Sequence, residues 1–209
     1  PEKEQLAPFE VAQLAFLKDE GKRIASELLR AQVELEDSGV LLWAPESYAN
    51  VSKLAESGDQ FYRDENFQEA IDAYEAAITL LDELKEMIPA MLESNLATGK
   101  AAINNGDSTT ALISWSIAHA IRPLDAEINN QLLRAENLED VLTHMKMAEF
   151  HERESALKEA LKAYLAAVRL DPAWTPADDG ASRIRSEIAR RAFTDAMSVG
   201  FTQLATKEY

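Results

Sequence analysis

VSKLAESGDQFYRDENFQEAIDAYEAAITLLD, residues 51–82, is the stretch that decides the predicted fold. Gly58 and Ala77 are small, which two helices need where their backbones approach closely. Phe61, Tyr74 and Ile78 are large enough to fill the space around such a crossing. The stretch therefore predicts two packed helices. A helical hairpin this short cannot bury its apolar face alone, so we expect further copies stacked against it.

The pattern of small and large residues in this stretch resembles one tetratricopeptide repeat. The matching positions are Leu54, Gly58 and Phe61 on the first helix, Phe67 at the turn, and Ala70, Tyr74 and Ala77 on the second helix. Leu54 replaces the usual Trp, Ser57 the usual Leu, and Asp82 the usual Pro. The resemblance implies an all-α fold, a right-handed solenoid of helical hairpins, that binds other proteins.

Further copies of the pattern follow along the chain. We expect repeats at about 46–87, 89–123 and 125–173, and an incomplete one at 175–209. Pro89 is expected to open the second copy, since proline suits a first helical turn. The small residue of each first helix is expected at Gly58, Gly99, Ala148 and Gly200. Successive spacings exceed the family period of about 34 residues by nearly whole helical turns, which predicts lengthened helices that still pack in phase.

Several polar residues are placed to start the second helices of the hairpins. Asn66 can cap the first of these helices, Asp107 or Ser108 the next, and Ser155 the third. The first helix of the third copy is expected to run unbroken from about Asp125 to Glu152.

Residues 1–45 are expected to form a separate N-terminal part, ahead of a repeat domain at 46–209. A long helix should run from Pro8 to about Asp37, followed by an apolar connector. Apolar residues recur along this helix with heptad-like spacing at Leu14, Leu17, Ile24, Leu28, Ala31 and Leu35. Two interpretations stay open: a capping helix packed on the repeats, or a coiled coil joining two chains.

Composition excludes several classes of function. A formal charge of −16 disfavours nucleic acid and anionic lipid, which both need a basic face. The acidic surface is either simply solvated or suited to a basic partner. Cysteine is absent, and no apolar run is long enough for a membrane span, so neither disulfides nor membrane insertion are expected. The chain starts at Pro1 and is expected to be part of a longer protein; cytoplasmic and periplasmic locations both stay open.

Few residues carry catalytic or metal-binding chemistry. His144 and His151 lie seven residues apart on one expected helix, with Met147 and Ala148 between them, an arrangement that could present two imidazoles to a metal. The repeat pattern instead places these residues on the packing face. Acidic pairs such as Glu139-Asp140 lie at expected helix ends or turns, without the apolar surroundings that would shift a carboxyl pKa. The sequence holds no phosphate-loop or nucleophile motif, so we expect neither enzyme activity, nor a cofactor, nor a metal.

The resemblance also implies a binding groove on the concave face of the first helices. Carried onto this chain, the groove residues are Asp59, Tyr62, Arg63, Leu96, Lys100, Ile103, Asn104, Met145, Glu149 and Glu152. The paired Lys and Asn residues that clamp a C-terminal carboxylate in some family members are replaced by Ala55, Asp59, Leu96 and Lys100. We therefore expect an adaptor that holds a partner peptide or helix of basic or amphipathic character. The alternative is a self-assembly module that forms a homo-oligomer through its N-terminal and lengthened helices, within a larger membrane-tethered or multi-domain protein.

Overall fold

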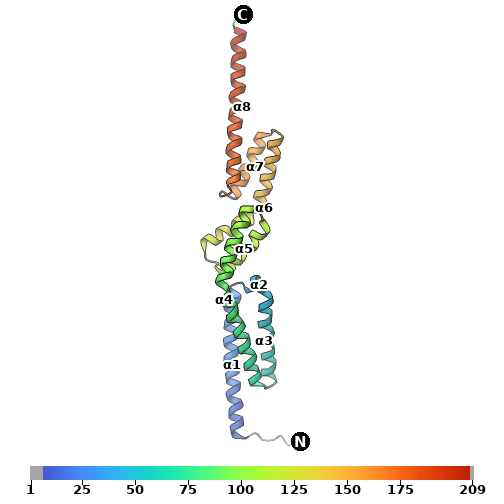
Figure 1. Ribbon diagram of the computed structural model, residues 1–209, viewed down its shortest axis with the longest axis vertical. Helices are drawn as coiled ribbons and strands as arrows, with labels where there is room; N and C mark the ends of the chain where they lie inside the picture. Colours follow the sequence, from blue (N-terminus) through green and yellow to red (C-terminus); the bar gives the residue numbers. More distant parts are fainter. Residues whose placement is uncertain (1–6, 208–209) are drawn as a thin grey trace. The chain divides into compact units, whose positions relative to one another are not determined.

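The computed structural model describes residues 7–207, and all the regular secondary structure in this part of the chain is α-helical (Figure 1). The helices are α1 (Pro8–Asp37), α2 (Val40–Trp43), α3 (Pro45–Arg63), α4 (Phe67–Asn105), α5 (Ser108–Ile121), α6 (Ala126–Arg153), α7 (Leu157–Leu170) and α8 (Thr175–Lys207). The all-α prediction is confirmed. The expected lead-in at 1–6, and the expected match of Tyr209 to Phe67, fall outside the described residues.

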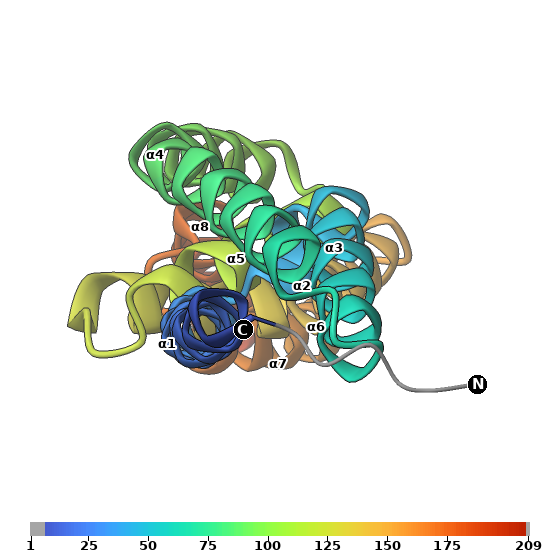
Figure 2. The same cartoon turned by 90° about the horizontal axis from the view of Figure 1, so that it is seen from below.

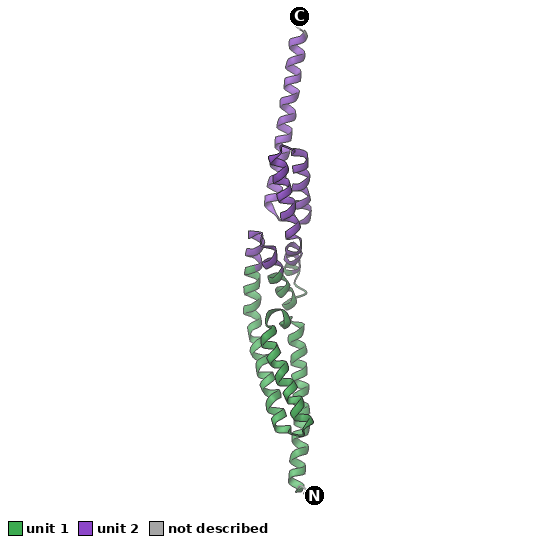
Figure 3. Cartoon of the chain, turned by 90° about the vertical axis from the view of Figure 1, so that its right-hand side faces the viewer, with its two compact units in different colours: residues 1–98, 113–128 green, residues 99–112, 129–209 purple. Residues whose placement is uncertain are grey.

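The chain divides into two compact units (Figure 3). Unit 1 comprises Pro1–Thr98 with Ile113–Ile128, and unit 2 comprises Gly99–Leu112 with Asn129–Tyr209. Helices α4, α5 and α6 each contribute residues to both units. The sequence division at residue 45 stays a prediction.

The prediction that Pro89 opens a new helix is wrong. Helix α4 is one helix of 39 residues, and Pro89 lies inside it. Proline removes one backbone hydrogen bond and crowds the preceding turn. Leu84 and Leu92, on either side of it, are both 5% exposed, so buried packing holds the helical path across the lost bond. The expected repeats 46–87 and 89–123 therefore share a helix.

The core of unit 1 lies between α1, α3 and α4. In the view from below, α1 appears end-on and α4 runs obliquely to it (Figure 2). The core includes Ile24, Leu28 and Leu35 of α1, Val51 of α3, and Tyr74, Ala77 and Leu81 of α4. The heptad-like stripe of α1 is thus buried within its own chain, as the capping interpretation expects, and is occupied rather than free to join a second chain.

Gly58 of α3 and Tyr74 of α4 make the closest contact of the first hairpin. A Cβ atom on Gly58 would lie 2.4 Å from Cε1 of Tyr74. The Tyr74 hydroxyl donates a hydrogen bond to Oδ1 of Asp59 at 2.7 Å. Burial, with this carboxylate as a second cause, raises the pKa of Tyr74 above its usual value. The small-against-large packing expected from the sequence is therefore present here.

Unit 2 repeats this arrangement with α6, α7 and α8. Tyr164 of α7 is 2% exposed and donates a hydrogen bond to Oε2 of Glu152 at 3.0 Å. A Cβ atom on Gly180 of α8 would lie 2.4 Å from Cε1 of Tyr164. Gly200, the residue expected in this role, has no atom within 4 Å of such a Cβ position. Gly180 is the small residue that packs α8 against α7. Gly200 is assigned to the incomplete repeat at 175–209, and that assignment stays a prediction.

Two turns place a residue other than glycine in the left-handed region. Glu65 has φ 60° between α3 and α4, and Ser155 has φ 59° between α6 and α7. Ser155 therefore shapes a turn, and the N-cap residue of α7 is Ala156. Asp107 does cap α5 as expected, because its Oδ1 accepts a hydrogen bond from the Thr110 backbone N–H at 3.0 Å. That bond lowers the pKa of Asp107.

Candidate interaction surfaces

In unit 1, helix α1 contacts Tyr62 of the expected groove. The Tyr62 hydroxyl donates a hydrogen bond to the Lys18 carbonyl oxygen of α1 at 3.3 Å, and its ring packs edge-on against Phe67. A Cβ atom on Gly21 of α1 would lie 3.2 Å from the same ring. Tyr62 therefore binds α1 in this structure, instead of presenting its ring to a partner.

The other groove residues of unit 1 are polar or half-buried. Asp59 accepts the hydrogen bond from Tyr74, and an Nη atom of Arg63 donates to the Gln60 side chain at 2.9 Å. Leu96 is half-buried on α4. These side chains serve contacts within the unit, and they do not form an open apolar strip together.

The groove residues of unit 2 are also divided between core and solvent. Ile103 is 2% exposed, so its expected place on a binding surface is corrected to the core. Met145 packs against the buried clusters of α6, α7 and α8. Glu152 accepts hydrogen bonds from Tyr164 and from Arg183 of α8. Lys100, Asn104 and Glu149 are exposed.

The two histidines of α6 are not in the core. His144 and His151 are half-buried and line a pocket of about 360 Å³ on the α6 and α7 side of unit 2. The remaining lining residues are Met147, Glu159, Lys162, Ala163, Ala166 and Arg169. The expectation that both imidazoles pack inside is therefore wrong. Within residues 7–207, no three or more His, Cys, Asp or Glu side chains gather closely enough to hold a metal ion.

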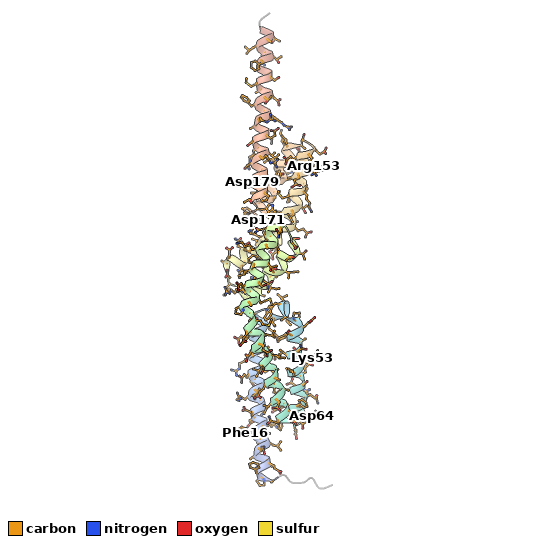
Figure 4. The ribbon with its side chains drawn as sticks, viewed as in Figure 1. Phe16, Lys53, Asp64, Arg153, Asp171 and Asp179 are labelled. Atoms are coloured by element: carbon orange, nitrogen blue, oxygen red, sulfur yellow. The ribbon has the colours of Figure 1, made fainter. Side chains whose placement is uncertain are left out.

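A buried ion pair fixes the turn from which α8 begins. Asp171, labelled in Figure 4, lies between α7 and α8 and is 2% exposed. The Nε atom of Arg134 lies 3.0 Å from each of its carboxylate oxygens, and the Ala173 backbone N–H donates to Oδ1 at 2.9 Å. These bonds hold the turn that precedes α8 against α6.

The C-terminal part of α8 extends past the turn between α6 and α7, with no other helix of unit 2 beside it (Figures 1 and 3). Beyond Ile188, which packs against the unit 2 core, every side chain up to Thr206 is exposed. This exposed segment carries five large apolar side chains: Phe193 (67% exposed), Met197 (43%), Val199 (56%), Phe201 (63%) and Leu204 (64%). Large apolar groups this dense on a water-exposed helix mark an interaction surface.

Charge is nearly absent from residues 192–206 of this segment. Asp195 is the one charged residue between Ala192 and Thr206, in a chain whose residues are 28% charged. Just before it, Glu187 accepts hydrogen bonds from Arg190 and Arg191, which lower its pKa to about 2. Glu187 therefore offsets one of the two positive charges within the helix itself.

A small hollow lies on the exposed part of α8. It measures about 150 Å³ and is lined by Ala196, Met197, Gly200, Phe201 and Leu204. Four of these residues stand at positions i, i+3, i+4 and i+7, the set that forms a hole for a partner side chain in helix pairing. The spacing is legible in the sequence. It was missed because Gly200 had been assigned to packing within a repeat.

A second exposed apolar group lies near the start of α1, which extends past the turn between α3 and α4 (Figure 1). Phe9 is 75% exposed and Phe16, labelled in Figure 4, is 67% exposed. The two are separated by one heptad, so they share a face of α1. Charged residues are more frequent in this part of α1, where residues 7–21 include Glu10, Lys18, Asp19 and Glu20, than in residues 192–206 of α8.

Comparison of the chain with protein-family models, with curated proteins and with solved structures gives no match. The tetratricopeptide resemblance thus stays a prediction from the residues. None of the helices in residues 7–207 combines the length and the apolar character that crossing a membrane requires.

Proposed function

We propose that this chain is a helical-hairpin protein of the tetratricopeptide kind that binds other proteins and carries out no catalysis. Its hairpins, each with a small residue against a buried tyrosine, support the comparison with that family's right-handed solenoids. The observation that carries the proposal is the exposed and almost uncharged face of α8. Such a face is costly to leave in water, so it is best explained as a surface that a partner covers.

The proposed binding surface differs from the one that the sequence predicted. Tyr62, Met145 and Glu152 of the expected groove are engaged by contacts within their own units. The exposed segment of α8 makes no such contacts. Since its exposed side chains are apolar, the partner surface is apolar too, rather than the basic surface that the net charge of the whole chain favours.

The test compares the proteins captured from the source cell by three forms of the chain. A Phe193→Ser/Leu204→Ser variant removes two exposed apolar groups of α8. A Phe150→Ser variant removes a comparably exposed aromatic of α6 and serves as the matched control. We expect the α8 variant to lose partners that the wild type and the control retain. Identical partner sets for all three would refute the proposal.

Self-assembly is the second candidate function, and the hollow around Gly200 favours it. A hole for a side chain is useful only if a partner helix lies against it. The heptad-like stripe of α1 is no longer available for this role, because Ile24, Leu28 and Leu35 are buried within unit 1.

A further inference from the structure

We propose that the exposed segment of α8 pairs in antiparallel orientation with the same segment of a second copy of this chain. This inference rests on the proposed function, since it names the partner of the same surface. The partner is a second copy of the chain, because the segment carries both a hole and the side chain that fills it.

The pairing face consists of Phe193, Met197, Gly200 and Leu204. Their spacings of four, three and four residues are those of the alternating core positions of a coiled coil. At 3.6 residues per turn, the four positions fall within a narrow stripe along one side of the helix. Asp195 lies two residues from Phe193 and two from Met197, on the opposite side of the helix, so the stripe itself carries no charge.

The stripe is complementary to itself when the second helix runs the other way. A two-fold axis between Ser198 and Val199 places Met197 of each copy opposite Gly200 of the other. The same axis places Phe193 opposite Leu204. Each Met197 then enters the hollow that Gly200 leaves open, and both contacts occur twice, as a two-fold interface requires. Parallel pairing would instead oppose Gly200 to Gly200 and leave a void.

This register keeps the paired segments clear of the unit 2 core. The axis brings residue 207 of one copy level with residue 190 of the other. The unit 2 core ends at Ile188, so the paired segments occupy the part of α8 that no other helix of unit 2 covers. The second copy therefore reaches the stripe without displacing α6 or α7.

The area of the stripe indicates a weak and reversible dimer. Phe193 and Leu204 are each about two-thirds exposed, and Met197 is 43% exposed. Phe201 flanks the stripe, lines the hollow and is 63% exposed, so it also contributes to the buried area. Large side chains bury about 150–250 Å² when fully covered, so the four contribute about 500 Å² per copy and about 1,000 Å² in total. That total is near the lower limit for a specific interface, the size class of weak and transient complexes.

Sedimentation velocity over a wide concentration range tests the pairing. We expect a reversible monomer–dimer equilibrium for the wild type, and the same equilibrium for Thr202→Glu, on the far side of α8. Met197→Glu should weaken it at least about tenfold, because a charge would enter an apolar interface. Gly200→Met fills the hollow and should also weaken pairing. The Met197→Gly/Gly200→Met double variant exchanges knob and hole between the facing positions, and should restore it.

Spin-label distances test the orientation, and the absence of cysteine allows single labelled sites. Antiparallel pairing separates the two copies of a label at Ser186 by about 37 Å along the helix, but leaves labels at Ser198 almost level. Parallel pairing would give similar distances at both positions, and would overturn the proposed register.

A wild type that stays monomeric at all concentrations would overturn the self-pairing. If the Phe193→Ser/Leu204→Ser variant still loses cellular partners in that case, the face binds a different protein and the proposed function stands. If the chain is monomeric and no partner is lost, both proposals fail.

Discussion

Replacing Gly58 by alanine adds a single methyl group at the closest contact of the first hairpin. The added Cβ would lie 2.4 Å, 2.6 Å and 3.1 Å from Cε1, Cδ1 and Cζ of Tyr74. These distances are well below normal carbon–carbon contact, so the ring or the helices must move. The ring has little freedom, because Tyr74 is 3% exposed and its hydroxyl is bonded to Asp59.

Two opposing terms set the size of the effect. Overpacking a well-filled contact costs about 1–3 kcal/mol. Alanine stabilises a helix interior by up to about 1 kcal/mol relative to glycine. The first term dominates, so Gly58→Ala should lower the free energy of unfolding by about 1–2 kcal/mol.

Urea unfolding followed by circular dichroism measures this difference. Gly180→Ala provides a parallel test in unit 2, since its Cβ would lie 2.4 Å from Cε1 of Tyr164. Gly200→Ala is the control, because its Cβ would have no atom within 4 Å and should not destabilise. If Gly58→Ala is as stable as the wild type or more stable, the argument from close packing is refuted.

Three further changes test local features of the fold. Glu65→Gly should raise the free energy of unfolding by about 1 kcal/mol in urea titrations, because φ at Glu65 is 60° and glycine adopts that conformation without strain. The hydrogen bond from the Thr110 backbone N–H lowers the pKa of Asp107 in the folded state. The stability that this bond contributes should therefore be complete above the pKa of the unfolded carboxyl group, and should be lost as the pH falls through the lowered pKa. Urea unfolding measured between about pH 2 and 6 should show this loss of stability in the wild type and not in Asp107→Asn. Arg134→Met leaves the carboxylate of Asp171 buried without its cation, and should lower the free energy of unfolding by about 3 kcal/mol in thermal or urea unfolding. The Arg134→Met/Asp171→Leu double variant should recover part of this loss. Equal stability of the wild type and the single variant would contradict this reasoning.

Local packing was predictable from the sequence where it depends on residues close together in the chain. Gly58 and Tyr74 are 16 positions apart, and their contact follows from helical geometry and side-chain size alone. The unbroken helix ending near residue 152 and the cap at Asp107 followed from equally local signals.

Contacts between helices farther apart in sequence were not predictable in the same way. Gly180 and Gly200 both lie on α8, and only tertiary packing determines that the first meets Tyr164 while the second faces solvent. Pro89 is a helix-start signal in isolation, but buried leucines on both sides carry α4 through it.

Two residues of the expected groove lie elsewhere for a related reason. Tyr62 and Ile103 are apolar residues on helices, and the sequence alone does not determine whether another helix covers them. In the structure α1 binds Tyr62, and Ile103 is in the core. Apolar stripes can be read from a sequence, but the neighbour that covers each stripe is a property of the whole fold.

Hydrogen exchange at the backbone amides of residues 192–206, measured as a function of protein concentration, tests most directly whether α8 pairs with a second copy. A solvated helix end without tertiary contacts opens readily, whereas a paired helix is protected. We predict that protection of these amides rises with concentration, while that of α7 stays constant. Fast exchange at every concentration would contradict the account.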